Sequence, residues 1–250
     1  AAAKMSHLNG QPTYHVQRRF DSQLFTLNQA GYLNGHVPFS AIFAFISLLA
    51  AVLYDFDYVF VGNENSANQP SLKWLNVDIN HQFSKSTKFE QDFFTYSKQF
   101  LLKNVEYYSL IRPFSELKIA QIFCTNTIFF PIFKSCNRFQ QRDAWCEVCP
   151  KCLFVFLMLS PFLAEQILTT QIFSHNLLND QNLLPTLKEL LGLAPIKPLE
   201  CVGTIEESQL AFYLTLKKYQ QENKPLPALL QQLQDQVLPL CSNWQKREQE

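Results

Sequence analysis

The chain has 250 residues, 47% of them hydrophobic, and it carries 21 basic Lys and Arg residues against 21 acidic Asp and Glu residues. This length and hydrophobic content predict a globular protein with a substantial core, and the zero net charge argues against a general nucleic-acid binder. The scarcity of Gly, at 6 residues against 23 Phe, argues against an all-β protein and favours aromatic-rich helices packed on a sheet.

The N-terminal part of the chain predicts one strand and one long buried helix. Residues 1–12 have no apolar pattern and no initiator methionine, so we expect them to be disordered, as a cloning remnant or a cut within a longer protein. Thr13–Arg19 alternates enough to predict a strand. Val37–Tyr54 has no charged residue, but it also lacks flanking basic anchors, which argues against a membrane span. It is expected to be a helix buried against a sheet, with Pro38 in its first turn.

The middle of the chain alternates between strand and helix patterns. Strands are predicted at Asp57–Gly62 and Val105–Ser109, and helices at Thr87–Lys103 and Phe114–Phe123, the latter capped at or just before Ser115. Because the crossovers between strands are about a dozen residues or longer, the strands are expected to be parallel. The pattern is typical of an α/β fold, and we predict a three-layer arrangement around a parallel sheet.

The last third of the chain is predicted to be helical. We expect an α/β domain over residues 13–165 and a helical appendage over residues 166–250, where prolines and a glycine interrupt the helices. Thr204 and Glu207 have the spacing of a helix capping box. Cys201, just before them, is expected to be a buried thiol.

Four cysteines with the spacing C-x9-C-x2-C-x2-C indicate a metal site. They are Cys136, Cys146, Cys149 and Cys152. Disulfides are a poorer interpretation, because the seven cysteines are odd in number and no signal peptide is present at the start of the chain. A redox C-x2-C pair is an alternative, but a third and a fourth cysteine favour zinc. Since a four-thiolate shell leaves no open position, we expect the zinc to be structural.

Polar side chains follow the Asp57–Gly62 strand, where open α/β sheets bind ligands. The residues that could hold a nucleotide or sugar there are Asn63, Glu64, Asn65, Ser66 and Asn68. The alternative interpretation is an ordinary solvated loop. A second polar cluster contains His81, Ser84 and Lys85, and it could supply a general base or a phosphate partner, although a lone surface histidine is more frequent.

Two further residues have a functional and a structural interpretation. His36 could bind substrate or cap the buried helix. Arg112 could hold a carboxylate or phosphate in a bidentate manner, or it could form a structural ion pair with Glu116.

The assembled motifs resemble the ATP-pyrophosphatase (PP-loop) superfamily. HVPFS at 36–40, VGNEN at 61–65, RPFSELKIAQIF at 112–123 and the cysteine cluster are similar to 7-cyano-7-deazaguanine synthase. The chain more closely resembles the UDP-N-acetylmuramoyl-L-alanyl-L-glutamate epimerases of bacterial cell-wall synthesis, over about residues 12–210. The segments that carry this resemblance are GYLNGHVPFSA, NENSAN, NVDINHQFSKS, FKSCN, WCEVCPKCLF and KPLECVGTIEES.

One motif of the superfamily is absent. The SGGxDS-type loop that binds the ATP pyrophosphate is not found, since the chain contains no Gly-Gly pair. We expect that loop upstream of Ala1, so that this chain alone would be inactive; a degenerate homologue is the alternative.

The resemblance implies a cytoplasmic, ATP- and Mg²⁺-dependent isomerase of peptidoglycan precursor synthesis and cell-shape maintenance, acting without nucleic acid or membrane. Adenylation of the glutamate α-carboxylate in UDP-MurNAc-L-Ala-L-Glu would acidify the Cα–H bond, so that a base could remove the proton. We expect His81 or Lys85 to be the base, Glu64 to be an alternative base or magnesium ligand, and Cys201 to lie behind them. The residues expected to bind substrate or nucleotide are His36, Ser40, Asn63, Asn65, Ser66, Asn68, Ser84 and Arg112.

Two other functions remain open from the sequence. Another adenylating enzyme of the superfamily could act on a deazapurine carboxylate. The non-enzymatic alternative is a binding module that zinc stabilises, for example one that binds RNA. The zero net charge of the chain argues against RNA binding.

Overall fold

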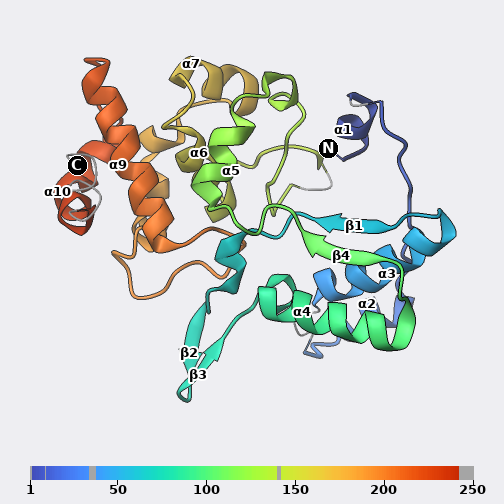
Figure 1. The fold of residues 1–250 in the computed structure, drawn as a ribbon. Coiled ribbons are helices and arrows are strands. Elements are labelled where there is room, and N and C mark those ends of the chain that lie inside the picture. The colour runs from blue at the N-terminus through green and yellow to red at the C-terminus, as the bar shows by residue number, and fades with distance from the viewer. Residues whose placement is uncertain (1, 9, 34–37, 140–141, 242–250) are drawn as a thin grey trace.

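The computed structural model describes residues 2–8, 10–33, 38–139 and 142–241 and contains helices and short strands (Figure 1). The helices are α1 (Ala2–Leu8), α2 (Ser22–Gln29), α3 (Phe39–Leu53), α4 (Thr87–Tyr96), α5 (Glu116–Phe123), α6 (Pro150–Leu159), α7 (Glu165–Ile167), α8 (Leu184–Leu190), α9 (Ile205–Gln221) and α10 (Ala228–Val237). The strands are β1 (Tyr58–Val61), β2 (Leu72–Trp74), β3 (Val77–Ile79) and β4 (Glu106–Ser109).

The long apolar run forms helix α3, as predicted, with Pro38 at the N-cap. Ala44, Leu48 and Ala51 recur at helical spacing and are buried, so they form the face that packs on the sheet. The opposite face is exposed, with Leu49 and Leu53 at 61% and 70% exposure. No helix among the described residues is long and apolar enough to cross a membrane.

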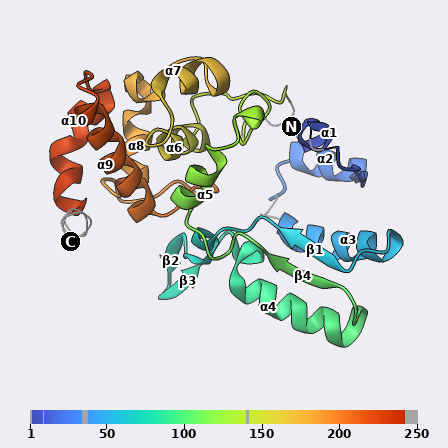
Figure 2. The ribbon, with the colours of Figure 1, turned by 45° about the horizontal axis from the view of Figure 1, so that its top comes forward.

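Strands β1 and β4 pair in parallel, from Tyr58 opposite Glu106 to Val61 opposite Ser109. Val59 and Val61 point to the core under α3 and α4, while Tyr58 and Phe60 point to the other face and are exposed. Figure 1 shows both helices below the strand pair, and Figure 2 shows the same elements turned by 45°. The parallel pairing is therefore confirmed, but the described residues contain a two-stranded sheet covered by these helices on one face rather than three layers.

Three local predictions differ from the structure. Thr13–Arg19 lies extended without pairing to a strand, and Tyr14 packs instead on the Tyr54 ring, with the ring centroids 4.1 Å apart. No strand was predicted between β1 and α4, but this segment contains the antiparallel hairpin β2–β3. Its turn residues Leu75 and Asn76 have positive φ, a conformation that period-two patterning does not signal. The N-terminal segment, expected to be disordered, forms α1.

A second core gathers around α6, in which every residue from Cys152 to Leu159 is buried. Helices α5, α8, α9 and α10 surround it, so the cysteine motif and the C-terminal helices share one core. The predicted caps hold the ends of these helices. Ser115 accepts from the Lys118 N–H at 3.2 Å at α5. Helicity after residue 165 is confirmed, and the predicted domain limits remain predictions.

Candidate functional site

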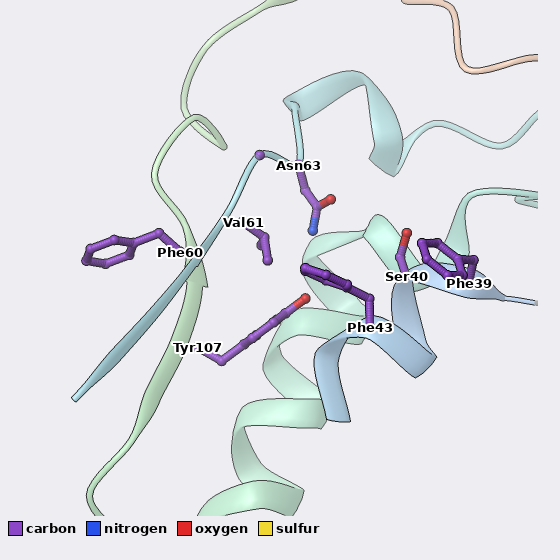
Figure 3. Close-up of a pocket in the computed structure, with 8 residues that line it drawn as sticks. Phe39, Ser40, Phe43, Phe60, Val61, Asn63 and Tyr107 are labelled. Carbon is purple, nitrogen blue, oxygen red and sulfur yellow. The ribbon is translucent and has the colours of Figure 1, made fainter. Parts of the chain in front are cut away.

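A cavity of about 400 Å³ opens at the carboxyl end of β1, between the sheet and the start of α3. Ser40, Asn63 and Tyr107 line it, and Figure 3 shows the Asn63 amide and the Tyr107 hydroxyl pointing toward each other, with the Phe43 ring between them and Ser40. The volume is in the range of small-molecule sites, which combine an apolar lining with a few polar groups. Ser40 and Asn63, both predicted binding residues, are thus brought together.

The loop after β1 is fixed to the end of β4. The Asn63 N–H donates to Ser109 Oγ at 3.0 Å, and that hydroxyl donates to the Asn63 carbonyl at 2.8 Å. Burial, together with the nearby Glu90 carboxylate, raises the pKa of Tyr107 to about 12. The phenol therefore stays protonated at neutral pH and can donate a hydrogen bond into the cavity.

Arg112 joins three segments at this end of the sheet. Its Nη1 donates to the Glu64 carbonyl at 2.9 Å, and its Nη2 donates to the Lys85 carbonyl at 2.7 Å and to the Glu90 carboxylate at 2.9 Å. Of the two interpretations of Arg112, the structural ion pair is found, but its partner is Glu90 of α4 and not Glu116. Arg112 Nε is buried without a hydrogen-bond partner among the described residues.

The side chains of the loop mostly bond to the protein. Asn68 Oδ1 accepts from the Thr87 N–H at 2.7 Å, and Asn68 Nδ2 donates to the Asn65 carbonyl at 3.1 Å. Ser66 and Ser84 are buried, and Ser66 Oγ has no hydrogen-bond partner in the described part of the chain. Hydrogen bonds within the protein thus hold this loop, while Asn65 and Asn68 themselves are exposed.

Lys85 and His81, two of the predicted catalytic residues, lie in different surroundings. Lys85 Nζ lies 3.4 Å from Gln82 Oε1 and 3.5 Å from Cys201 Sγ, so the segment around Cys201 returns to the loop. The His81 ring instead shares a hydrogen bond with Ser71 at the base of the hairpin. His36 lies outside the described residues.

Sequence reasoning missed two charged residues beside this region. Glu116 and Lys151 line a second cavity of about 160 Å³ between α5 and α6. Glu116 was considered only as a partner of Arg112, and Lys151 was hidden inside the cysteine motif. The sequence signal for Glu116 was a glutamate in the first turn of a helix, directly after the N-cap Ser115. An acidic residue is common at this position for helix stability alone, so the signal did not indicate a function.

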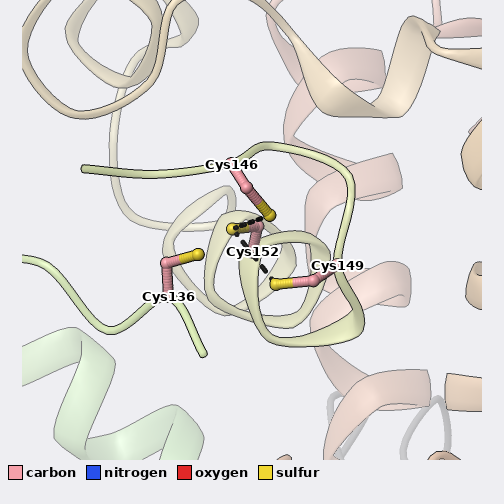
Figure 4. Close-up of side chains that lie close together, drawn as sticks. All are labelled: Cys136, Cys146, Cys149 and Cys152. Carbon is pink, nitrogen blue, oxygen red and sulfur yellow. Dashed lines mark hydrogen bonds between the residues drawn. The ribbon is translucent and has the colours of Figure 1, made fainter. Parts of the chain in front are cut away.

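The four predicted metal ligands come together (Figure 4). Their sulfur atoms all lie within 4.8 Å of one another; the residues are Cys136, Cys146, Cys149 and Cys152. Cys152 Sγ is 3.8 Å from the sulfur of Cys146 and 3.4 Å from that of Cys149. Four thiolates around a tetrahedral zinc ion would be separated by about 3.8 Å, so the sites agree in size. The group could hold a metal ion.

Local structure favours a thiolate at one of the four cysteines. Hydrogen bonding between Cys149 and Cys152 lowers the pKa of Cys149 to about 4 and raises that of Cys152, and burial raises the pKa of Cys146. Glu147 has a φ of 62°, which forms the tight turn between the second and third cysteines. Its carboxylate accepts from the Ser174 N–H at 2.7 Å, so the turn is held to the following helical region.

Comparison with known proteins finds two family models on this chain. The MurL N-terminal domain matches residues 1–110, and the MurL C-terminal domain matches residues 132–247. No solved structure matches.

Curated relatives named UDP-N-acetyl-alpha-D-muramoyl-L-alanyl-L-glutamate epimerase are similar over most of the chain. The Micromonospora protein is 38% identical over 226 residues, 89% of this chain and 50% of its own length. The Salinispora tropica protein is 41% identical over 82% of this chain and 46% of its own length. The Xanthomonas oryzae pv. oryzae protein is 37% identical over 92% and 52%. The chain therefore spans about half the length of these relatives.

Proposed function

The chain belongs to the MurL epimerase family, and on that premise we propose that the protein containing it converts the terminal L-glutamate of UDP-MurNAc-L-Ala-L-Glu to D-glutamate. The observation that carries the proposal is the similarity, over 82–92% of this chain, to relatives named for that epimerisation. The substrate would be an intermediate of peptidoglycan precursor synthesis.

Activation of the glutamate α-carboxylate by ATP completes the proposal. An ionised carboxylate opposes loss of the neighbouring Cα proton, because the carbanion would lie beside existing negative charge. An acyl adenylate removes that charge and stabilises the enolate, which lowers the barrier to proton transfer. ATP with Mg²⁺ and a PP-loop type of nucleotide site therefore form part of the proposed function.

Described residues are suited to binding and orienting such a substrate. Ser40, Asn63 and the neutral Tyr107 phenol offer hydrogen bonds in the cavity after β1. Lys85 is the better of the two predicted bases or acids, because its Nζ lies 3.5 Å from Cys201 Sγ, where the segment before α4 contacts the segment before α9. The His81 imidazole is engaged with Ser71 at the hairpin, so its proposed role is to position that segment.

A structural zinc ion in the four-cysteine group is also part of the proposal. The sulfur positions fit a tetrahedral site, and the buried thiols would be costly to ionise without a cation. Bound zinc would hold the Cys136 loop to the start of α6, and therefore set the position of α5 and α6.

The test uses the full-length protein with ATP, Mg²⁺ and UDP-MurNAc-L-Ala-L-Glu. We expect AMP and pyrophosphate release that depends on the dipeptide substrate, together with a D-glutamyl product. Epimerisation without ATP would refute adenylation, whereas AMP release only with a deazaguanine carboxylate would favour the related nitrile-forming chemistry.

The catalytic assignment is tested separately with Lys85→Ala and His81→Ala. Loss of a proton-transferring group should reduce formation of the D-glutamyl product by about 10²–10⁴ while adenylate formation persists. We expect this for Lys85→Ala, and we expect His81→Ala to lower both adenylate and product formation together with stability. Unchanged formation of the D-glutamyl product in Lys85→Ala would exclude Lys85 as a proton-transferring group.

A further inference from the structure

Glu116 is the first residue of α5, and it lies close to the starts of α6 and α9. Its backbone N–H donates to Glu207 Oε1 at 2.7 Å. The other oxygen of Glu207 accepts from the Thr204 N–H at 2.8 Å at the start of α9. Both oxygens of the Glu207 carboxyl group therefore cap helix starts, and its role is structural.

The side chain of Glu116 has a different environment from that of Glu207. Within the described residues its carboxylate accepts no hydrogen bond, and it lines the cavity between α5 and α6. The remaining walls are mostly apolar, formed by residues that include Phe123, Phe133 and Phe154. A carboxylate on an apolar cavity wall without a protein donor is available to a ligand.

Charged groups from every neighbouring element act on Glu116. Burial is the largest influence and raises its pKa to about 7; Lys151 of α6 and Lys85 lower it, while Glu64 and Glu207 raise it. A general base transfers protons best when its pKa is near the working pH. Both protonation states of Glu116 are thus populated near neutral pH, whereas an ordinary surface glutamate is fully ionised.

Lys151 completes the chemistry of the cavity. It lines the same cavity and lies over the Phe154 ring, with Nζ 5.3 Å from the ring centroid. An ammonium group there can pair with a carboxyl oxygen or a phosphate of a ligand. Glu116 and Lys151 therefore offer an acid–base group and a cation to the same small volume.

We infer that Glu116 is a catalytic residue that removes the Cα proton of the substrate's terminal glutamyl group, with Lys151 holding the activated carboxyl oxygen. This inference rests on the proposed function. The Cα–H bond breaks as the Glu116 O–H bond forms, and the electron pair moves into the enolate of the activated carboxyl group. The Lys85 ammonium gives a proton to the opposite face, which forms the new Cα–H bond with inverted configuration. Water then cleaves the acyl–phosphate bond of the adenylate, which releases AMP and the D-glutamyl carboxylate.

The experiment uses the full-length enzyme in deuterated buffer with the L-glutamyl substrate, ATP and Mg²⁺. AMP release and deuterium incorporation at the glutamyl Cα are measured together. Glu116→Gln keeps the shape of the side chain but removes the base, so we expect AMP release within about threefold of the unchanged enzyme. Exchange should fall by about 10²–10⁴.

Glu206→Gln is the matched control, because Glu206 is exposed in the first turn of α9 and belongs to the same charged region. It should leave both half-reactions unchanged. In the unchanged enzyme the exchange rate should rise with pH through a midpoint near the Glu116 pKa of about 7, and this dependence should be absent in Glu116→Gln.

The outcomes separate the two proposals. Normal exchange in Glu116→Gln would overturn the role of Glu116, as would a parallel fall of AMP release, exchange and melting temperature. Exchange that needs Glu116 but no ATP would support Glu116 and refute the adenylation step.

Discussion

Gly203→Ala should destabilise the protein, because Gly203 lies in the contact between α5, α6 and α9. A Cβ atom at this position would come within 2.6 Å of Glu207 Oε2, 2.7 Å of Phe154 and 3.1 Å of the Glu116 Cγ atom. Real Cβ atoms essentially never approach other atoms so closely, so either the Phe154 ring or the Glu207 carboxylate must move. Gly203 does not have the left-handed φ that disfavours alanine, so the cost comes from the contact itself.

The magnitude follows from what must move. Overpacking in a filled core costs about 1–3 kcal/mol. Displacing Glu207 also weakens its hydrogen bonds to the Thr204 and Glu116 N–H groups, at about 1 kcal/mol. We therefore expect a loss of about 2–4 kcal/mol in the free energy of unfolding, which corresponds to a melting temperature lower by about 4–16 °C.

Urea unfolding followed by tryptophan fluorescence measures this change, since Trp145 is 9% exposed within the same core. Gly62→Ala is the matched control, because a Cβ there would meet only the Ile111 side chain at an ordinary 3.8 Å. It should change stability by less than about 0.5 kcal/mol. If Gly203→Ala unfolds at the same urea concentration as Gly62→Ala, the close packing of Glu116 and Glu207 against Gly203 is wrong.

Three further predictions concern metal, capping and pH. Cys149→Ser should lose both a bound zinc ion and the folded state, because structural zinc contributes about 10–16 kcal/mol to folding. Cys124→Ser, outside the cluster, should keep its zinc and its fold. Elemental analysis measures the zinc, and circular dichroism measures the fold. Thr204→Ala should cost about 0.5–2 kcal/mol in urea unfolding, since it removes the side-chain cap of α9. Burial raises the pKa of Glu116 from 4.5 to about 7, so the folded state holds this proton more tightly than the unfolded state. The stability that protonation of Glu116 contributes is complete below about pH 4.5 and is lost as pH rises through 7. The stability of the unchanged protein relative to Glu116→Gln should therefore fall between pH 5 and pH 8. An equal dependence of stability on pH in both proteins would contradict this sign.

The local elements could be predicted from the sequence because their signals are local. Strands β1 and β4, the helix after Pro38 and the caps at Ser115 and Thr204 depend on side chains within a few residues of one another. The cysteine cluster could be predicted for a related reason, since thiolates at this spacing have few uses other than metal binding.

The site depended on groups that are distant in the chain. Arg112 pairs with Glu90 and not with the nearby Glu116, because helix α4 packs against β4 and places Glu90 beside the guanidinium. Lys85 meets Cys201 across 116 positions. The periodicity of apolar residues and the spacing of motifs do not predict such contacts.

The sequence alone determined helix α3, strands β1 and β4, the caps at Ser115 and Thr204 and the gathering of the four cysteines, because short-range geometry decides these features. It did not determine the hairpin β2–β3 or helix α1. Only the tertiary structure decided the chemical state of Glu116. Its pKa depends on burial and on charges from the loop after β1, from α6 and from α9, and desolvation and Coulomb interactions act through space, whatever the separation along the chain.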